Sequence, residues 1–208
     1  MWPRLFTIFV KITGALPMWV LYRPKVLVVG KGTGARRRLP RACVVVSNHT
    51  GVWDYAVILL VFPFRFLRYL MAELLFEMNK FFSFFLRSRG GIYVNRKGGL
   101  HFLRTALDVL YRDGAVGIFP ESRLPDDKTQ MLPFTTTAVQ LALRAHVPIV
   151  PVYLTRRTRP FQRVRVAIGA PVYYFTADTP DAVRVQEWTR ELQDTVARLG
   201  EILAEKKK

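Results

Sequence analysis

The stretch ACVVVSNHTGVWDY at residues 42–55 sets an apolar run directly before a histidine and an aspartate. The run at 42–46 is continuously apolar and rich in valine, which is typical of a strand buried on both faces of a parallel sheet. The Thr-Gly pair at 50–51 favours a turn after this strand. We therefore expect His49 in the turn that follows a buried strand, and Asp54 in the first part of the next helix.

A carboxylate next to one ring nitrogen of a histidine has a clear chemical use. It fixes the tautomer of the imidazole and stabilises the imidazolium, so that the other ring nitrogen acts as a general base. We expect His49 and Asp54 to form such a catalytic pair, with backbone N–H groups near Thr50 and Gly51 as candidate donors to an oxyanion. A capped helix start beside a surface histidine is the alternative, and this stretch alone leaves both interpretations open.

Apolar runs and helix-length segments alternate along the rest of the chain. Runs rich in Val and Ile predict strands at 26–29, 43–46, 92–94, 115–119, 149–153 and 164–168. Helices are expected between them at 52–62, 73–87, 99–112 and 136–145, and an apolar stripe predicts a C-terminal amphipathic helix over 185–203. This alternation predicts an α/β fold with a mostly parallel central sheet flanked by helices.

The N-terminal segment 1–24 differs from the rest of the chain. Its apolar part at 5–22 is interrupted by Lys11, Gly14 and Pro17, whereas a helix that crosses a bilayer needs about 20 predominantly apolar residues. An interfacial or re-entrant membrane-associating helix is therefore preferred over a spanning helix. We expect a single catalytic domain at 25–208 to follow it.

The charge balance indicates an anionic partner, because 32 Lys and Arg residues outnumber 15 Asp and Glu and leave a net charge of +17. Phenylalanine rings cluster with cations at 62–70 and 79–89, a combination that suits anionic membrane lipid at the headgroup boundary. Ordinary core packing is the alternative role for many of these rings. Signatures of nucleic-acid-binding domains are absent from the sequence, so we expect no nucleic-acid partner.

Several other functions have no support in the residues. The glycines at 30–34 resemble a dinucleotide fingerprint, but Pro40 and the next strand follow too soon for a crossover helix. The three histidines are scattered, so no metal site is expected, and Cys43 has no partner cysteine, which favours a reducing compartment.

Four blocks in order make the sequence resemble the glycerophospholipid acyltransferase family, whose best-known members are the lysophosphatidate acyltransferases. The blocks are the H-x-x-x-x-D motif of His49 and Asp54 with the preceding Asn48, GGIYVNR with Gly91 and Arg96, FPESR with Glu121 and Arg123, and VPIVPV at 147–152. The chain departs from the family pattern in three ways: Ser122 replaces the usual glycine, Arg123 follows the glutamate at two positions instead of three, and threonines occupy 135–137, where many members carry Lys and Gly.

The resemblance implies transfer of a fatty acyl group from acyl-CoA or acyl-carrier protein to the free hydroxyl of 1-acylglycerol-3-phosphate, which gives phosphatidate. It implies catalytic roles for His49 and Asp54, phosphate binding by Arg96 and Arg123, and acceptor positioning by Glu121, Asn48 and Gly91. No cofactor beyond the thioester co-substrate is expected, and the location would be the cytoplasmic face of the cell membrane. Another lysophospholipid or a non-phosphate lysolipid as acceptor, or an inactive basic membrane-binding protein, remains as an alternative.

Overall fold

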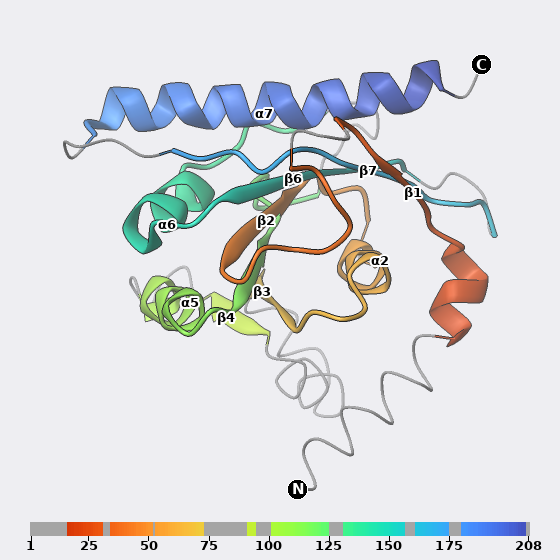
Figure 1. Ribbon diagram of the computed structural model, residues 1–208, viewed down its shortest axis with the longest axis horizontal. Helices are drawn as coiled ribbons and strands as arrows, with labels where there is room; N and C mark the ends of the chain where they lie inside the picture. Colours follow the sequence, from red (N-terminus) through yellow and green to blue (C-terminus); the bar gives the residue numbers. More distant parts are fainter. Residues whose placement is uncertain are drawn as a thin grey trace, which may run out of the picture.

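A computed structural model describes residues 16–30, 34–51, 53–72, 91–94, 101–124, 131–156, 161–174 and 180–206. Within these residues a seven-stranded sheet has the strand order β1-β7-β6-β2-β5-β3-β4 (Figure 1). The strands are β1 (Lys25–Val28), β2 (Cys43–Ser47), β3 (Leu67–Ala72), β4 (Ile92–Val94), β5 (Ala115–Ile118), β6 (Ile149–Leu154) and β7 (Arg165–Ile168). The predicted strands are thus confirmed, with boundaries shifted by at most one residue.

The helices around the sheet are α2 (Asp54–Val61), α5 (His101–Tyr111), α6 (Thr137–Ala145) and α7 (Ala182–Glu205), and residues 16–22 are also helical. The expected helix at 73–87 lies outside the described residues. In the described part of the chain, no helix combines the length and the apolar composition that crossing a membrane requires. The predicted α/β fold with helices flanking a mostly parallel sheet is confirmed.

Strand direction brings five strand ends to one edge of the sheet. Neighbouring strands are parallel from β6 through β2, β5 and β3 to β4, so their carboxyl ends share an edge. Strands β6 and β7 pair antiparallel, and β1 runs parallel to β7. Parallel strands place whatever follows them at their common carboxyl edge, and in open α/β sheets this is where sites form.

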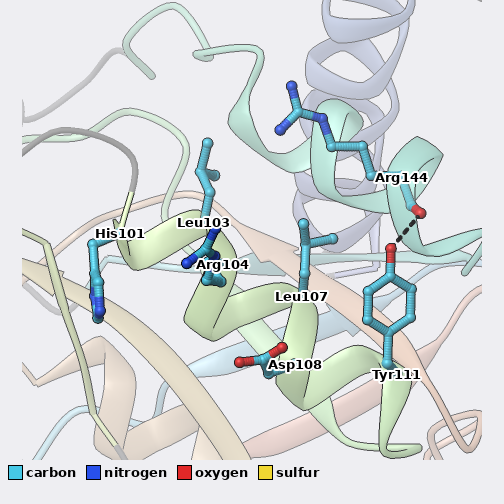
Figure 2. Close-up of a pocket in the computed structure, with 7 residues that line it drawn as sticks. All are labelled: His101, Leu103, Arg104, Leu107, Asp108, Tyr111 and Arg144. Carbon is cyan, nitrogen blue, oxygen red and sulfur yellow. Dashed lines mark hydrogen bonds between the residues drawn. The ribbon is translucent and has the colours of Figure 1, made fainter.

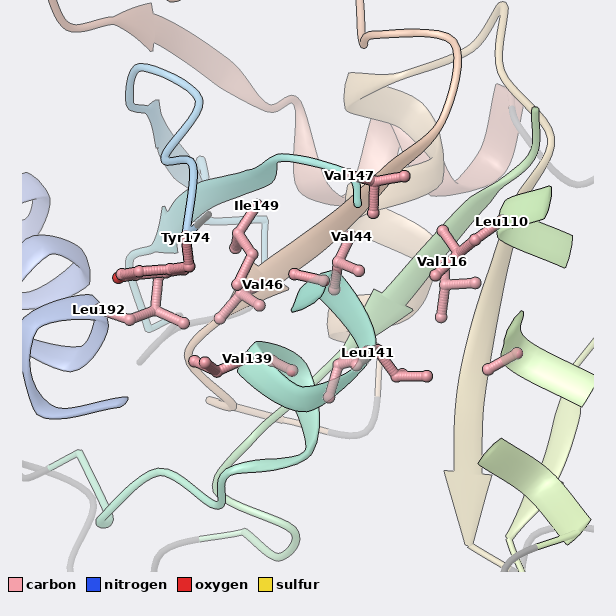
Figure 3. Close-up of a cluster of buried hydrophobic side chains, with 14 of the residues drawn as sticks. Val44, Val46, Leu110, Val116, Val139, Leu141, Val147, Ile149, Tyr174 and Leu192 are labelled. Atoms are coloured by element: carbon pink, nitrogen blue, oxygen red, sulfur yellow. The ribbon is translucent and has the colours of Figure 1, made fainter. Parts of the chain in front are cut away.

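Both faces of β2 are buried, which explains its uninterrupted apolar run. Val44 and Val46 pack on one face with side chains from α5, α6 and α7, as Figure 3 shows for Leu110, Leu141 and Leu192. Cys43 and Val45 face the opposite way and join the cluster beneath α2. Burial raises the pKa of the Cys43 thiol to about 12, so this residue is a core side chain without thiolate reactivity.

Strand β3 was not predicted from the sequence. Its residues alternate between buried and partly exposed, with Leu67, Tyr69 and Met71 buried. Part of the aromatic and basic stretch 62–70, interpreted above as a headgroup boundary, is therefore ordinary core: Phe62 and Tyr69 are buried, whereas Phe64 is almost fully exposed. The alternation of cations with apolar residues belongs to a half-buried strand.

The packing of β3 on β5 depends on a glycine. Gly117 pairs with Tyr69, and a Cβ at Gly117 would overlap the Tyr69 ring, which is fully buried. We predict that Gly117→Ala lowers the free energy of unfolding by about 1–3 kcal/mol, because the ring has no room to move. Urea denaturation of the purified protein measures this.

A double-mutant cycle with Tyr69→Leu isolates the contact. The smaller side chain gives room for the added methyl group, so Gly117→Ala should cost less in the Tyr69→Leu background. Strictly additive losses would show that the overlap with the ring is not the cause.

Candidate active site

The site lies at the carboxyl edge of the sheet, where β2, β5 and β6 end. Strand β2 ends at Ser47, and His49 follows it in a turn, while Asp54 is the first residue of α2. These positions agree with the expectation from the sequence. The block after β5 and the end of β6 contribute the residues that surround this turn.

His49 and Asp54 are in direct contact. Nδ1 of His49 is 2.9 Å from Oδ2 of Asp54, and the two side chains are 20% and 10% exposed. A carboxylate only accepts hydrogen bonds, so a neutral imidazole in this contact carries its proton on Nδ1 and its lone pair on Nε2. The arrangement leaves Nε2 as a proton acceptor, which is the geometry that a general base requires.

Asp54 also organises the turn that carries His49. Its Oδ2 accepts from the backbone N–H groups of Thr50 and of Gly51, the latter at 2.8 Å, and its Oδ1 accepts from the Thr50 hydroxyl at 2.9 Å. The N–H groups of Thr50 and Gly51, named above as candidate donors to an oxyanion, already donate to Asp54. One carboxylate fixes both the loop and the imidazole.

Glu121 holds the backbone on the other side of His49. Its Oε1 accepts from the His49 N–H at 2.7 Å, and its Oε2 accepts from the Leu132 N–H at 2.8 Å. Burial raises the pKa of this carboxyl, and the two backbone hydrogen bonds oppose that rise. Each oxygen thus accepts from one backbone group of this chain, and the acceptor-positioning role expected for Glu121 stays a prediction.

Asn48 is a structural bridge between strands. Its side-chain oxygen accepts from the Leu154 N–H at 2.7 Å, and its amide nitrogen donates to the Leu154 carbonyl at 3.0 Å. This pair of bonds continues the ladder between β2 and β6 one step past its last backbone pair. Asn48 is 6% exposed and both polar atoms of its side chain bond Leu154, so it acts on the site through the backbone of the next residue, His49.

The remaining predicted residues are only partly brought together. Arg123 follows Glu121 and is exposed, and among the residues that the structure describes it has no carboxylate partner. Gly91 precedes β4, one residue before the pair of Ile92 with Leu70, so the strand separates it from the edge that holds His49. Arg96 lies outside the described residues.

Three aromatic rings, which the sequence did not reveal as part of the site, pack behind the imidazole of His49. They belong to Phe119, Tyr69 and Tyr55. The Phe119 ring stacks on the His49 ring with centroids 4.4 Å apart and an interplanar angle of 14°. Tyr69 lies behind Phe119 at 5.0 Å, and Tyr55 meets Tyr69 edge-on at 5.4 Å. The available signal was the position of Phe119 directly after β5, at the same edge as His49.

Where the structure describes the chain, neither a group of metal-binding side chains nor the hollow on the surface belongs to the site at the His49–Asp54 pair. Within the described ranges, no group of three His, Cys, Asp or Glu residues is arranged to hold a metal ion. A hollow on the outer side of α5 and α6 is lined by His101, Leu103, Arg104, Leu107, Asp108, Tyr111 and Arg144 (Figure 2). It shares no residue with the His49–Asp54 pair.

Comparisons of the sequence with known proteins identify a family. The sequence model of the Acyltransferase family matches residues 33–155. Human 1-acyl-sn-glycerol-3-phosphate acyltransferase beta is 35% identical over 123 residues, which are 56% of this chain and 43% of the human protein. The chain therefore spans less than half the length of that relative.

A solved structure shares the fold. The crystal structure of the 1-acyl-sn-glycerophosphate (LPA) acyltransferase PlsC from Thermotoga maritima superposes with a TM-score of 0.63 at 20% identity. The superposition covers 90% of this chain and 75% of that chain. At this identity the likeness concerns the architecture described above.

Proposed function

This chain belongs to the Acyltransferase family, and on that premise we propose that it transfers a fatty acyl group from a thioester to the free hydroxyl of 1-acylglycerol-3-phosphate. The observation that carries the proposal is the His49–Asp54 contact at the carboxyl edge of the sheet. The acceptor is suggested by the names of the human relative and of the Thermotoga protein. The donor is acyl-CoA or acyl-carrier protein.

The proposed reaction uses the acceptor itself as the nucleophile. Nε2 of His49 takes the proton of the acceptor hydroxyl while the hydroxyl oxygen attacks the thioester carbonyl. The new C–O bond forms, the C–S bond breaks, and the imidazolium returns its proton to the departing thiolate. Asp54 holds the ring through Nδ1 and stabilises the imidazolium, so no acyl-enzyme is required.

Arg123 is the candidate for the acceptor phosphate among the described residues. Its exposed guanidinium follows Glu121, which is tied to the backbone of His49. A guanidinium offers two parallel N–H groups that match two phosphate oxygens. Arg96 remains part of the proposal through its position in the second block.

The experiment that tests this function follows free thiol and phosphatidate together. Purified protein in detergent is given acyl-CoA or acyl-carrier protein with lysophosphatidate, and we expect equal amounts of thiol and phosphatidate. Arg123→Gln should raise KM for lysophosphatidate about tenfold or more, because a charge-assisted contact is lost, while KM for the donor stays unchanged.

Arg144→Gln is the matched control, because Arg144 is an exposed arginine on the outer side of α6. Faster turnover of a lysophospholipid with another headgroup, with no effect of Arg123→Gln, would point to that acceptor instead. Thioester consumption without any lipid product would contradict the proposed reaction.

We also propose that the protein binds peripherally to the cytoplasmic face of the cell membrane. The outer face of the helical segment 16–22 exposes Leu16, Trp19 and Val20, while Tyr22 is buried in the core. Tyr22 accepts from the Val164 N–H, and Thr155, which follows β6, donates to Arg165 at the start of β7. These contacts hold the segment 16–22 at the same sheet edge as His49. Its exposed apolar side chains therefore lie where a lipid acceptor would arrive. The cytoplasmic face follows from the intracellular thioester donors.

We predict that Trp19→Asp weakens binding to vesicles that contain anionic lipid by about tenfold. The substitution puts a charge on the proposed contact surface in place of an amphipathic ring that favours the interface. Vesicle co-sedimentation measures the change. Val183→Asp is the control, since Val183 is equally exposed but lies at the start of α7. Equal losses in both variants, or no loss in Trp19→Asp, would contradict a specific membrane face.

A further inference from the structure

Two residues of the block that follows β5 hold His49 from different sides. Phe119 covers one face of the imidazole, and Glu121 binds the backbone N–H of the same residue. We infer that Phe119 and Glu121 are positioning residues, which fix the orientation of the His49 ring, and that this part of the block acts on the base instead of on the acceptor. The inference deepens the proposed function and rests on it.

Glu121 fixes the backbone of His49 beyond the point where the pairing of β2 with β5 ends. The last backbone pair of β2 with β5 is Val46 with Ile118, so His49 lies three residues beyond the ladder on the β5 side. The carboxylate of Glu121 bridges that gap with one oxygen and holds Leu132 with the other. Pro120 also accepts from the Thr135 N–H at 2.9 Å, so two bonds connect this block to the segment before α6. The position of the His49 backbone is therefore fixed by the Glu121 carboxylate, which is itself held in place by its hydrogen bond to Leu132.

Phe119 limits the rotation of the His49 ring, which the hydrogen bond to the His49 backbone does not restrain. The hydrogen bond to Asp54 restrains Nδ1, but the ring still has freedom to tilt about that bond. A stack at 14° removes the tilt on one side. The Phe119 ring has no room to move away from His49, because it stacks on Tyr69, which is itself packed against Gly117. Three contacts, to Asp54, Glu121 and Phe119, thus aim Nε2 in one direction.

Positioning has a kinetic signature that a contact with the acceptor lacks. A general base that is displaced by a fraction of an ångström loses catalytic rate, while the affinity for the acceptor is kept. Phe119→Leu and Glu121→Gln are each expected to lower kcat about ten- to a hundredfold with KM for lysophosphatidate unchanged within about twofold. Phe119→Tyr keeps the ring face and should restore most of the rate.

A spectroscopic measurement tests the inference independently of turnover. In the wild type, the ring current of Phe119 should move the ring proton resonances of His49 upfield, and the hydrogen bond to Glu121 should move its amide proton downfield. We expect the first displacement to disappear in Phe119→Leu and to remain in Phe119→Tyr, and the second to diminish in Glu121→Gln. The resonances are assigned by comparison with His49→Asn.

The outcomes separate this inference from the proposed function. If the His49 resonances shift as expected and the wild type turns over no lysophosphatidate, the acceptor is wrong and the positioning stands. Unchanged resonances in Phe119→Leu, or a raised KM with unchanged kcat in Glu121→Gln, would overturn the inference. Phe119→Met, which keeps a large apolar side chain without a ring, replaces Phe119→Leu if that variant fails to fold.

Discussion

His49→Ala should lower kcat for acyl transfer by about a thousandfold, with KM for the thioester unchanged. General base catalysis contributes about 10²- to 10⁴-fold, and the structure offers Nε2 of His49 for this step. The side chain is only 20% exposed, so its removal leaves a small cavity beside Phe119, and added imidazole is expected to restore part of the rate. Initial rates of thiol release with and without imidazole measure both effects.

His101→Ala is the control for this prediction. His101 is the exposed first residue of α5 and has no part in the contact with Asp54. Its substitution should change kcat by less than about twofold. A loss below tenfold in His49→Ala would mean that another group accepts the proton from the acceptor hydroxyl, and the assignment of His49 would be abandoned.

Asp54→Asn should lower kcat about a hundredfold or more and leave the fold intact. An asparagine can place its oxygen where Oδ2 accepts from His49, Thr50 and Gly51, and its amide nitrogen can donate to the Thr50 hydroxyl. The hydrogen bonds of the turn are thus kept, but the negative charge that stabilises the imidazolium is lost. Steady-state rates and thermal unfolding are measured on the same preparation.

Comparison of Asp54→Ala with Asp54→Asn separates the effect of the lost charge from the effect of the lost hydrogen bonds in the turn. Asp54→Ala leaves the N–H groups of Thr50 and Gly51 without their acceptor, which costs about 1–3 kcal/mol for each group that stays buried. We therefore expect Asp54→Ala to unfold at lower temperature than Asp54→Asn, with a similar loss of kcat. If Asp54→Asn retains full activity, the carboxylate serves the turn alone.

The departure at Ser122 has a structural explanation. Ser122 adopts a φ of +59°, a left-handed conformation in which glycine has no steric cost. This accounts for the glycine that the family usually carries there. The serine keeps the left-handed turn, and Arg123 follows it, two residues after Glu121, which accepts from the His49 N–H.

Much of the fold was readable from local sequence patterns. Continuous apolar runs predict the strands that are buried on both faces, such as β2 and β6, and the stripe from Val185 to Leu203 predicts α7. Strand β3 escaped prediction because Arg68 interrupts its apolar residues and because its pairing with β5 joins distant parts of the chain. The direction of β7 was also not predicted: β6 and β7 are consecutive strands, yet apolar runs show only that each is a buried strand and not that the two pair antiparallel.

For the site, the pairing of His49 with Asp54 could be anticipated from the sequence, because the two residues are five positions apart and one turn brings them into contact. The residues around this pair could not, because they come from distant parts of the chain. Glu121 is 72 residues from His49, and Asn48 is 106 residues from Leu154. Such contacts depend on the order and register of the strands, because parallel strands bring residues together across long loops, whereas sequence patterns report only near neighbours.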